Sequence, residues 1–247
     1  MAARYAECYA AGGLHAVRQS RAGGTPDLGT APAVIYLNHP SWWDPLVLLI
    51  VAQRHWPDRR HFAPIDATAL GRYRVLESLG FFGIERGTVA GARRFAQATR
   101  SILAEPRAVL WLTPQGRFAD PRKRAAALEP GLAWLAQRAT PDVSFVPLAL
   151  EYPFWEERTA ECLLRFGPVL EREQLAAFDS AERGRRLAAE LEATQDRLAE
   201  ESLGRRAADF ETLVQGAAGV GGVYDAWRWL MARVRGERFR AEHGGGE

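Results

Sequence analysis

The chain has 247 residues, of which 47% are hydrophobic, so it is long enough to bury a sizeable core as one large domain. This composition excludes a disordered chain and a fibrous repeat protein. The net charge is only +2, with Lys123 as the sole lysine, and this near-neutral balance gives no general attraction to nucleic acid.

The first two thirds of the chain alternate short apolar runs with amphipathic segments. In chain order the pattern predicts a helix over 2–11, a loop over 21–32, a strand over 33–37, a helix from Ser41 to just before Pro57, strands over 61–65 and 79–85, a helix over 88–104, a strand over 108–112, a helix over 129–139, and strands over 143–150 and 162–166. Such alternation is typical of an α/β fold with a mainly parallel central sheet and helices on both faces.

Beyond residue 170 the apolar residues follow a helical spacing of i, i+4, i+7 and i+11. The residues on this apolar face are Leu187, Leu191, Thr194 and Leu198. We therefore expect a main domain over 1–170, which includes the short N-terminal helix, and a helical C-terminal extension over 171–247 packed on the same domain.

Residues 224–240 form the second amphipathic segment of this extension, rich in aromatic residues and arginine. Arginines border its apolar arc, where their heads could reach lipid phosphates. No apolar run approaches the roughly 20 residues of a membrane span, so we expect any membrane contact to be peripheral. The segment is a candidate membrane-surface helix, and the alternative is that its apolar arc packs onto the main domain.

The segment Asn38-His-Pro-Ser-Trp-Trp-Asp-Pro45 lies where a buried strand ends and a helix begins, the place where open α/β sheets bind ligands. The five-residue offset can fold the carboxylate of Asp44 back toward the imidazole of His39. A carboxylate there would hold one tautomer of the ring and stabilise the imidazolium that forms when the ring accepts a proton. Ser41-x-x-Asp44 also matches a helix capping box, in which Asp44 would only cap the helix. The spacing alone leaves both interpretations open.

Three further blocks follow in chain order. They are Gly80-Phe-Phe-Gly-Ile-Glu-Arg-Gly87, Thr113-Pro-Gln-Gly116, and Val146-Pro147 at the end of the third strong strand. Together with the His39–Asp44 segment, they resemble the four signature blocks of the glycerolipid acyltransferases, the family of lysophosphatidic acid acyltransferase. The resemblance runs from about residue 14 to residue 170.

The resemblance implies an enzyme that moves a fatty acyl group from acyl-CoA or acyl carrier protein to a hydroxyl of a lipid acceptor, such as 1-acylglycerol-3-phosphate. His39 would be the general base and Asp44 its orienting partner. The residues expected to contact the acceptor are Arg86, Pro114, Gln115, Gly116 and Arg117. No metal or redox cofactor is implied. With two cysteines and no signal-peptide pattern, the expected location is cytoplasmic, peripheral on the inner face of the membrane.

Three positions depart from the family pattern, and they leave the acceptor open. Gln115 stands where the family usually has Glu, Arg117 where it has Thr, and Phe118 where it has Arg. A glycolipid or a hydroxylated isoprenoid is therefore a possible acceptor as well as a lysophosphatidate. Arg86 as an ordinary surface arginine and Gly116 as a turn glycine are the simpler interpretations of those two residues.

Two other function classes stay open from the sequence. They are a non-catalytic lipid-binding protein that keeps the fold and a thioesterase-like hydrolase in which water replaces the lipid alcohol. The chain contains no Gly-x-Ser-x-Gly motif, which leaves a serine hydrolase with little support. His55, Asp58 and His61 lack a regular spacing of metal ligands, so we expect no metal site there.

Overall fold

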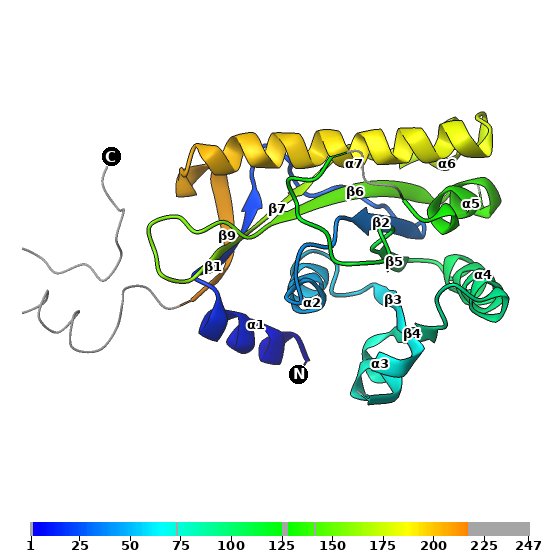
Figure 1. Cartoon of the computed structure of the whole chain (residues 1–247), viewed down its shortest axis with the longest axis horizontal. Helices are drawn as coiled ribbons and strands as arrows, with labels where there is room; N and C mark the ends of the chain where they lie inside the picture. Colours follow the sequence, from blue (N-terminus) through cyan, green and yellow to red (C-terminus); the bar gives the residue numbers. More distant parts are fainter. Residues whose placement is uncertain (1, 73, 125–127, 141, 217–247) are drawn as a thin grey trace, which may run out of the picture.

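The computed structural model describes residues 2–72, 74–124, 128–140 and 142–216, and within these ranges nine strands form one sheet (Figure 1). The strands are β1 (Ala16–Ser20), β2 (Ala33–Leu37), β3 (Arg60–Asp66), β4 (Phe81–Ile84), β5 (Ala108–Leu112), β6 (Ser144–Glu151), β7 (Glu161–Phe166), β8 (Leu170–Glu171) and β9 (Phe210–Gln215). Their order across the sheet is β4-β3-β5-β2-β6-β7-β1-β9, and β8 pairs with β6.

The part of the sheet from β4 to β6 is parallel. Strand β7 then runs antiparallel to β6, β1 runs parallel to β7, and β9 runs antiparallel to β1. Parallel neighbours end at the same edge of a sheet, so the loops that follow β2, β5 and β6 lie next to one another. This edge of the sheet is where the candidate site residues predicted from the sequence can come together.

Helices cover both faces of the sheet. They are α1 (Ala2–Gly13), α2 (Asp44–His55), α3 (Ala67–Arg72), α4 (Val89–Leu103), α5 (Pro130–Arg138), α6 (Arg172–Ala176) and α7 (Ser180–Leu203), with short 3-10 helices η1 (Arg74–Leu79) and η2 (Ala207–Asp209). Helices α1 and α2 pack on one face, and α4 to α7 pack on the other. In Figure 1, α7 runs along β6 and β7, with α1 and α2 on the opposite side.

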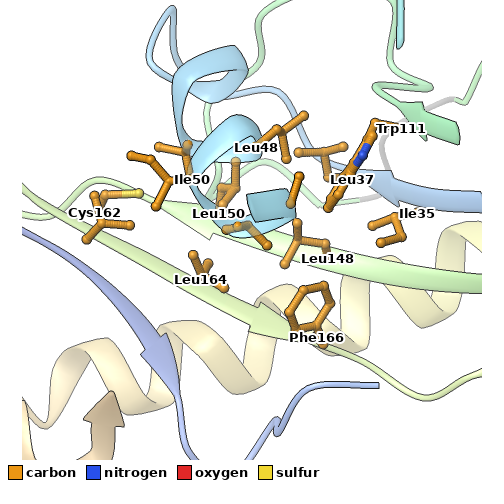
Figure 2. Packing of buried hydrophobic residues seen from close by; sticks show 14 of the residues in the cluster. Ile35, Leu37, Leu48, Ile50, Trp111, Leu148, Leu150, Cys162, Leu164 and Phe166 are labelled. Carbon is orange, nitrogen blue, oxygen red and sulfur yellow. The ribbon is translucent and has the colours of Figure 1, made fainter. Parts of the chain in front are cut away.

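Strand β2 shows why the central strands are unbroken apolar runs. Ile35 and Leu37 join the core under α1 and α2, whereas Val34 and Tyr36 join the core under α4, α5 and α7. All four are fully buried, because both faces of the strand are covered. Figure 2 shows the first of these cores, where Leu48 and its neighbours on α2 meet the side chains of the sheet.

The predicted α/β class, with a mainly parallel sheet and helices on both faces, is confirmed. Every predicted strand matches an observed one to within two residues, and so does every predicted helix in the main domain except the one placed at Ser41. That helix begins at Asp44, three residues later. The placement of Val146-Pro147 at the end of a strand is also wrong, because both residues lie in the middle of β6, paired with Ile35 and Tyr36 of β2.

Within the described residues, the chain after β8 contributes helices α6 and α7, the short η2 and strand β9. Helix α7 packs on the sheet with the predicted face inward, and Leu187, Leu191 and Leu198 are buried. Strand β9, which the sequence did not predict, pairs with β1 at the edge of the sheet. The predicted helix over 224–240 lies outside the described residues. Among the helices that are described, none has the length and apolar character needed to cross a membrane.

Candidate active site

The structure brings His39 and Asp44 together at the carboxyl end of β2. The strand ends at Leu37, and the chain turns back so that the first residue of α2 faces the imidazole. Nδ1 of His39 lies 2.5 Å from Oδ2 of Asp44, a short hydrogen bond. The side chain of Asp44 is 1% exposed and the imidazole is 19% exposed. A buried carboxylate thus holds a ring that solvent can reach.

The same carboxylate also stabilises the turn before α2. The backbone N–H of Ser41 donates to Oδ2 of Asp44 at 3.3 Å, and the Ser41 hydroxyl accepts the N–H of Trp43 at 3.2 Å. Because its hydroxyl closes this local turn, Ser41 does not cap the helix, and Trp43 is the N-cap residue without a side-chain cap. Asp44 therefore bonds both the imidazole and the turn, and the capping-box interpretation is wrong because Ser41 is not the N-cap residue.

The loop after β5 holds the backbone of His39 on both sides. Its N–H donates to Oε1 of Gln115 at 3.0 Å, and its carbonyl accepts the N–H of Ala119 at 2.9 Å. Between these two contacts, the ring of Phe118 lies against the imidazole, with 4.3 Å between the ring centroids. Phe118 is 58% exposed. The imidazole is therefore fixed at its backbone and has an apolar wall at the surface.

Asn38 ties the end of β2 to β6. The regular pairing of these strands ends at Leu37 and Leu148. The Asn38 side chain continues it, because Nδ2 donates to the carbonyl of Leu150 and Oδ1 accepts the N–H of Leu150, both at 2.8 Å. Asn38 is 1% exposed. This pair of buried hydrogen bonds holds the residue before His39 in place.

The arrangement leaves one imidazole nitrogen available for chemistry. An ionised Asp44 can only accept hydrogen bonds, so Nδ1 of His39 carries the proton and Nε2 presents a lone pair. Among the described residues, none forms a hydrogen bond with Nε2. Such a ring can take a proton from a bound hydroxyl, and the buried carboxylate stabilises the imidazolium that results. A base placed in this way typically contributes ~10²–10⁴ in rate.

The remaining predicted residues of the β5 loop have different positions. Gln115 is 7% exposed and faces the backbone of His39. Pro114 is buried, and its carbonyl accepts the N–H of Glu129 at 2.7 Å. Gly116 has a φ of 65°, and a Cβ atom there would lie 3.3 Å from Cγ of Glu129. Glycine is therefore required for the backbone conformation of this turn.

The two predicted arginines lie on the rim of the same edge. Arg117 is exposed, and no other described residue pairs with it. Arg86 follows β4, its side chain is 57% exposed, and its Nε lies 3.9 Å from Oδ2 of Asp66. Strand β4 is three strands from β2, about 14 Å along the sheet at the usual strand spacing. The structure thus groups His39, Asp44 and Gln115, with Arg117 beside them and Arg86 farther along.

Three residues that shape the site were not among the candidates from the sequence. They are Asn38, Phe118 and Tyr152, whose hydroxyl donates to Oδ1 of Asp44 at 2.7 Å. Asn38 directly precedes His39, and Tyr152 directly follows β6, the strand next to β2. A polar side chain just past a central parallel strand is the signal that could have identified both. Within the described residues, no three metal-binding side chains form a group that could hold an ion.

Comparisons with known proteins bear on the fold and the family of the chain. The chain is similar in structure to the 1-acyl-sn-glycerophosphate (LPA) acyltransferase PlsC from Thermotoga maritima, with 13% sequence identity and a TM-score of 0.53, over 83% of this chain and 77% of that chain. At this identity the similarity supports the fold alone. No curated protein matches the sequence significantly. The family model described as Acyltransferase matches residues 13–151, more than half of the sequence, and the chain therefore belongs to the acyltransferase family.

Proposed function

We propose that this chain transfers a fatty acyl group from the thioester of acyl-CoA or acyl carrier protein to a hydroxyl of a lipid acceptor. The observation that carries the proposal is the 2.5 Å hydrogen bond between a solvent-reachable imidazole, His39, and a buried carboxylate, Asp44. Membership in the acyltransferase family implies acyl transfer as the reaction class. The similar PlsC structure is of an LPA acyltransferase, which makes 1-acylglycerol-3-phosphate the first acceptor to test.

In the proposed reaction the acceptor hydroxyl is the nucleophile. Nε2 of His39 takes its proton while the oxygen attacks the thioester carbonyl, and Asp44 stabilises the imidazolium that forms. The tetrahedral intermediate then collapses, the carbon–sulfur bond breaks, and the imidazolium returns the proton to the leaving thiolate. Because the acceptor supplies the nucleophile, this reaction needs no catalytic serine and no covalent intermediate on the protein.

The residues around His39 favour an acceptor that combines an apolar body with an anionic or polar head. Arg117 is exposed beside the site, and its guanidinium can bind a phosphate through two hydrogen bonds. Phe118 adds apolar surface against the imidazole, where the family pattern has an arginine. This replacement supports a second acceptor class, a lipid alcohol without phosphate such as a glycolipid or an isoprenoid.

Contact with a bilayer is part of the proposal, and an aromatic cluster beside the site supports it. Tyr5 and Tyr9 on α1 are 65% and 45% exposed, and Trp42, between His39 and Asp44 in the chain, is 63% exposed. The rings of Tyr9 and Trp42 are 6.1 Å apart. Tyrosine and tryptophan favour the membrane–water interface. We infer peripheral attachment at the inner face of the membrane of a cytoplasmic protein, with this cluster on the lipid.

Sedimentation with lipid vesicles tests the attachment. Trp42→Ala should weaken co-sedimentation of the full chain with phosphatidylglycerol-containing vesicles. Leu203→Ala is the matched control, because Leu203 is 84% exposed at the end of α7 and lies away from the aromatic cluster. If Trp42→Ala, Leu203→Ala and the wild-type protein all co-sediment with the vesicles to the same extent, the aromatic cluster does not contact the membrane.

An assay with radiolabelled acyl-CoA tests the activity itself. Purified protein is supplied with 1-acylglycerol-3-phosphate, with a total lipid extract, or with no acceptor, and labelled lipids and free fatty acid are separated. We expect labelled lipid that depends on the acceptor and a loss of at least about 100-fold in folded His39→Ala. His55→Ala serves as the control for loss of an imidazole. Free fatty acid formed equally with and without acceptor would indicate a hydrolase. A protein that binds lipid but forms neither labelled lipid nor free fatty acid would be non-catalytic.

A further inference from the structure

Asp44 has a second hydrogen-bond partner on the side away from His39. Its Oδ2 accepts the imidazole N–H, and its Oδ1 accepts the hydroxyl of Tyr152 at 2.7 Å. The three groups form one chain, from the phenol through the carboxylate to the imidazole. Both oxygens of a carboxylate that is 1% exposed are therefore held by side chains from different parts of the fold.

The register of the sheet places Tyr152 at this position. The residue follows Glu151, the last residue of β6, and lies two residues after Leu150. The Asn38 side chain clamps Leu150 through two 2.8 Å hydrogen bonds, and His39 is the next residue after Asn38. The same clamp thus sets where the end of β2 and the end of β6 lie relative to each other. It therefore helps to fix the position of Tyr152 relative to His39 and Asp44.

The phenol of Tyr152 is kept protonated and can act only as a donor to Asp44. Burial, together with the neighbouring Cys162 and Asp44, raises the pKa of Tyr152 well above its usual value. Burial also raises the pKa of Cys162, which lies beside the phenol, so that its sulfur stays a neutral thiol. Neither group therefore adds a negative charge beside the carboxylate of Asp44.

We propose that Tyr152 is a positioning residue for the acyl transfer reaction, which orients the carboxylate of Asp44 so that Oδ2 stays aligned with Nδ1 of His39. A carboxylate held at one oxygen can rotate about its last bond, whereas one held at both oxygens cannot. The Tyr152 hydroxyl donates to one oxygen of Asp44 while the other oxygen faces His39, so Tyr152 acts on the imidazole through Asp44. The expected change in kcat rests on the proposed function, whereas the orientation of Asp44 by Tyr152 rests on the hydrogen bonds alone.

The substitution Tyr152→Phe removes the hydroxyl and keeps the ring. We expect kcat to fall by about tenfold, in the range typical of a lost hydrogen bond to a charged group, while KM for acyl-CoA and for the acceptor stays unchanged. Tyr36→Phe is the matched control. Tyr36 is a buried tyrosine on the opposite face of β2, and among the described residues its hydroxyl has no hydrogen-bond partner. The control should keep wild-type kcat.

A double-mutant comparison separates an effect through Asp44 from an independent effect of losing the Tyr152 hydroxyl. In the Asp44→Asn background, Tyr152→Phe should cause little further loss, because the two residues act along one path. An independent, additive tenfold loss there would overturn the proposal, and so would a Tyr152→Phe enzyme within twofold of the wild-type kcat.

Proton NMR gives a readout that does not depend on activity. The Nδ1 proton of His39, bonded to a buried carboxylate, should resonate far downfield in the wild-type protein and in Tyr36→Phe, move in Tyr152→Phe, and disappear in His39→Ala. An unchanged resonance in Tyr152→Phe would refute the positioning role. If no acceptor is acylated by the wild-type protein, the proposed function fails, and the NMR experiment still decides whether Tyr152 positions Asp44.

Discussion

Replacing Gln115 with methionine separates two possible roles for this residue. The family resemblance predicts that Gln115 contacts the acceptor, whereas its Oε1 lies 3.0 Å from the backbone nitrogen of His39. Methionine has a similar length and flexibility but no comparable acceptor atom. Gln115→Glu keeps an oxygen for the same N–H group. The pair of variants therefore changes the hydrogen bond in one case and preserves it in the other.

The size of the effect follows from the burial of the site. Gln115 is 7% exposed, so its loss as an acceptor leaves the N–H of His39 without a partner in a largely dry environment. An unpaired buried donor costs about 1–3 kcal/mol, which corresponds to about 5- to 150-fold in rate if the turn relaxes and the imidazole loses its alignment. The bonds to Asp44 and Ala119 remain, so we expect about tenfold.

The assay compares kcat and KM for acyl-CoA and for several acceptors in the two variants, with thermal unfolding as a check on folding. If Gln115 positions His39, Gln115→Met lowers kcat by a similar factor for every acceptor, and Gln115→Glu stays close to the wild-type value. A Gln115→Met enzyme that keeps the wild-type kcat but changes the order of preferred acceptors would refute this reasoning. That result would restore the acceptor contact predicted by the resemblance.

Three further predictions concern the apolar wall, a buried histidine and a close contact. Phe118→Ala should raise the ratio of free fatty acid to acylated lipid, because water gains access to the imidazole, and an unchanged ratio would contradict this. Burial lowers the pKa of His61, so the unfolded chain binds the proton more tightly than the folded protein does. The unfolding free energy, measured with denaturant, should therefore be constant just above about pH 6.5 and fall below that pH by up to about 1.4 kcal/mol per pH unit. A flat profile below pH 6.5 would exclude this contribution. Gly13→Ala would place a Cβ atom against the ring of Trp43 and should cost ~1–3 kcal/mol of stability and lower Tm, whereas Gly12→Ala, whose Cβ atom would meet nothing within 4 Å, should not.

The sequence predicts best the strands that consist of apolar residues alone, because such residues indicate burial without reference to the rest of the chain. The stretches 33–37 and 108–112 are apolar at every position because both faces of β2 and β5 are covered, and their bounds match the prediction. The His39–Asp44 pair is local in the same sense. The two residues are five positions apart across one turn, so their spacing alone suggests the contact, whereas the distant residues Gln115 and Tyr152 that hold the pair give no local sign.

Strand β1 could not be predicted because its burial depends on distant partners. Its last three residues, Arg18, Gln19 and Ser20, are polar and yet buried. Nε of Arg18 lies 2.9 Å from Oε2 of Glu161, and Nη1 donates to the hydroxyl of Thr212 at 2.6 Å. These partners stand on β7 and β9, far along the chain. A polar segment gives no local sign that such partners will cover it.

The strand order also shows where the three departures from the family pattern lie relative to His39. Strands β5 and β6 flank β2, so Gln115 and Phe118 in the β5 loop contact His39 directly, and Tyr152 after β6 contacts Asp44. Strand β4, which carries Arg86, lies at the far edge of the sheet. The changed positions therefore lie in the loop that borders the imidazole, where the proposed reaction brings the acceptor hydroxyl. Acceptor choice should follow the β5 loop more closely than it follows Arg86.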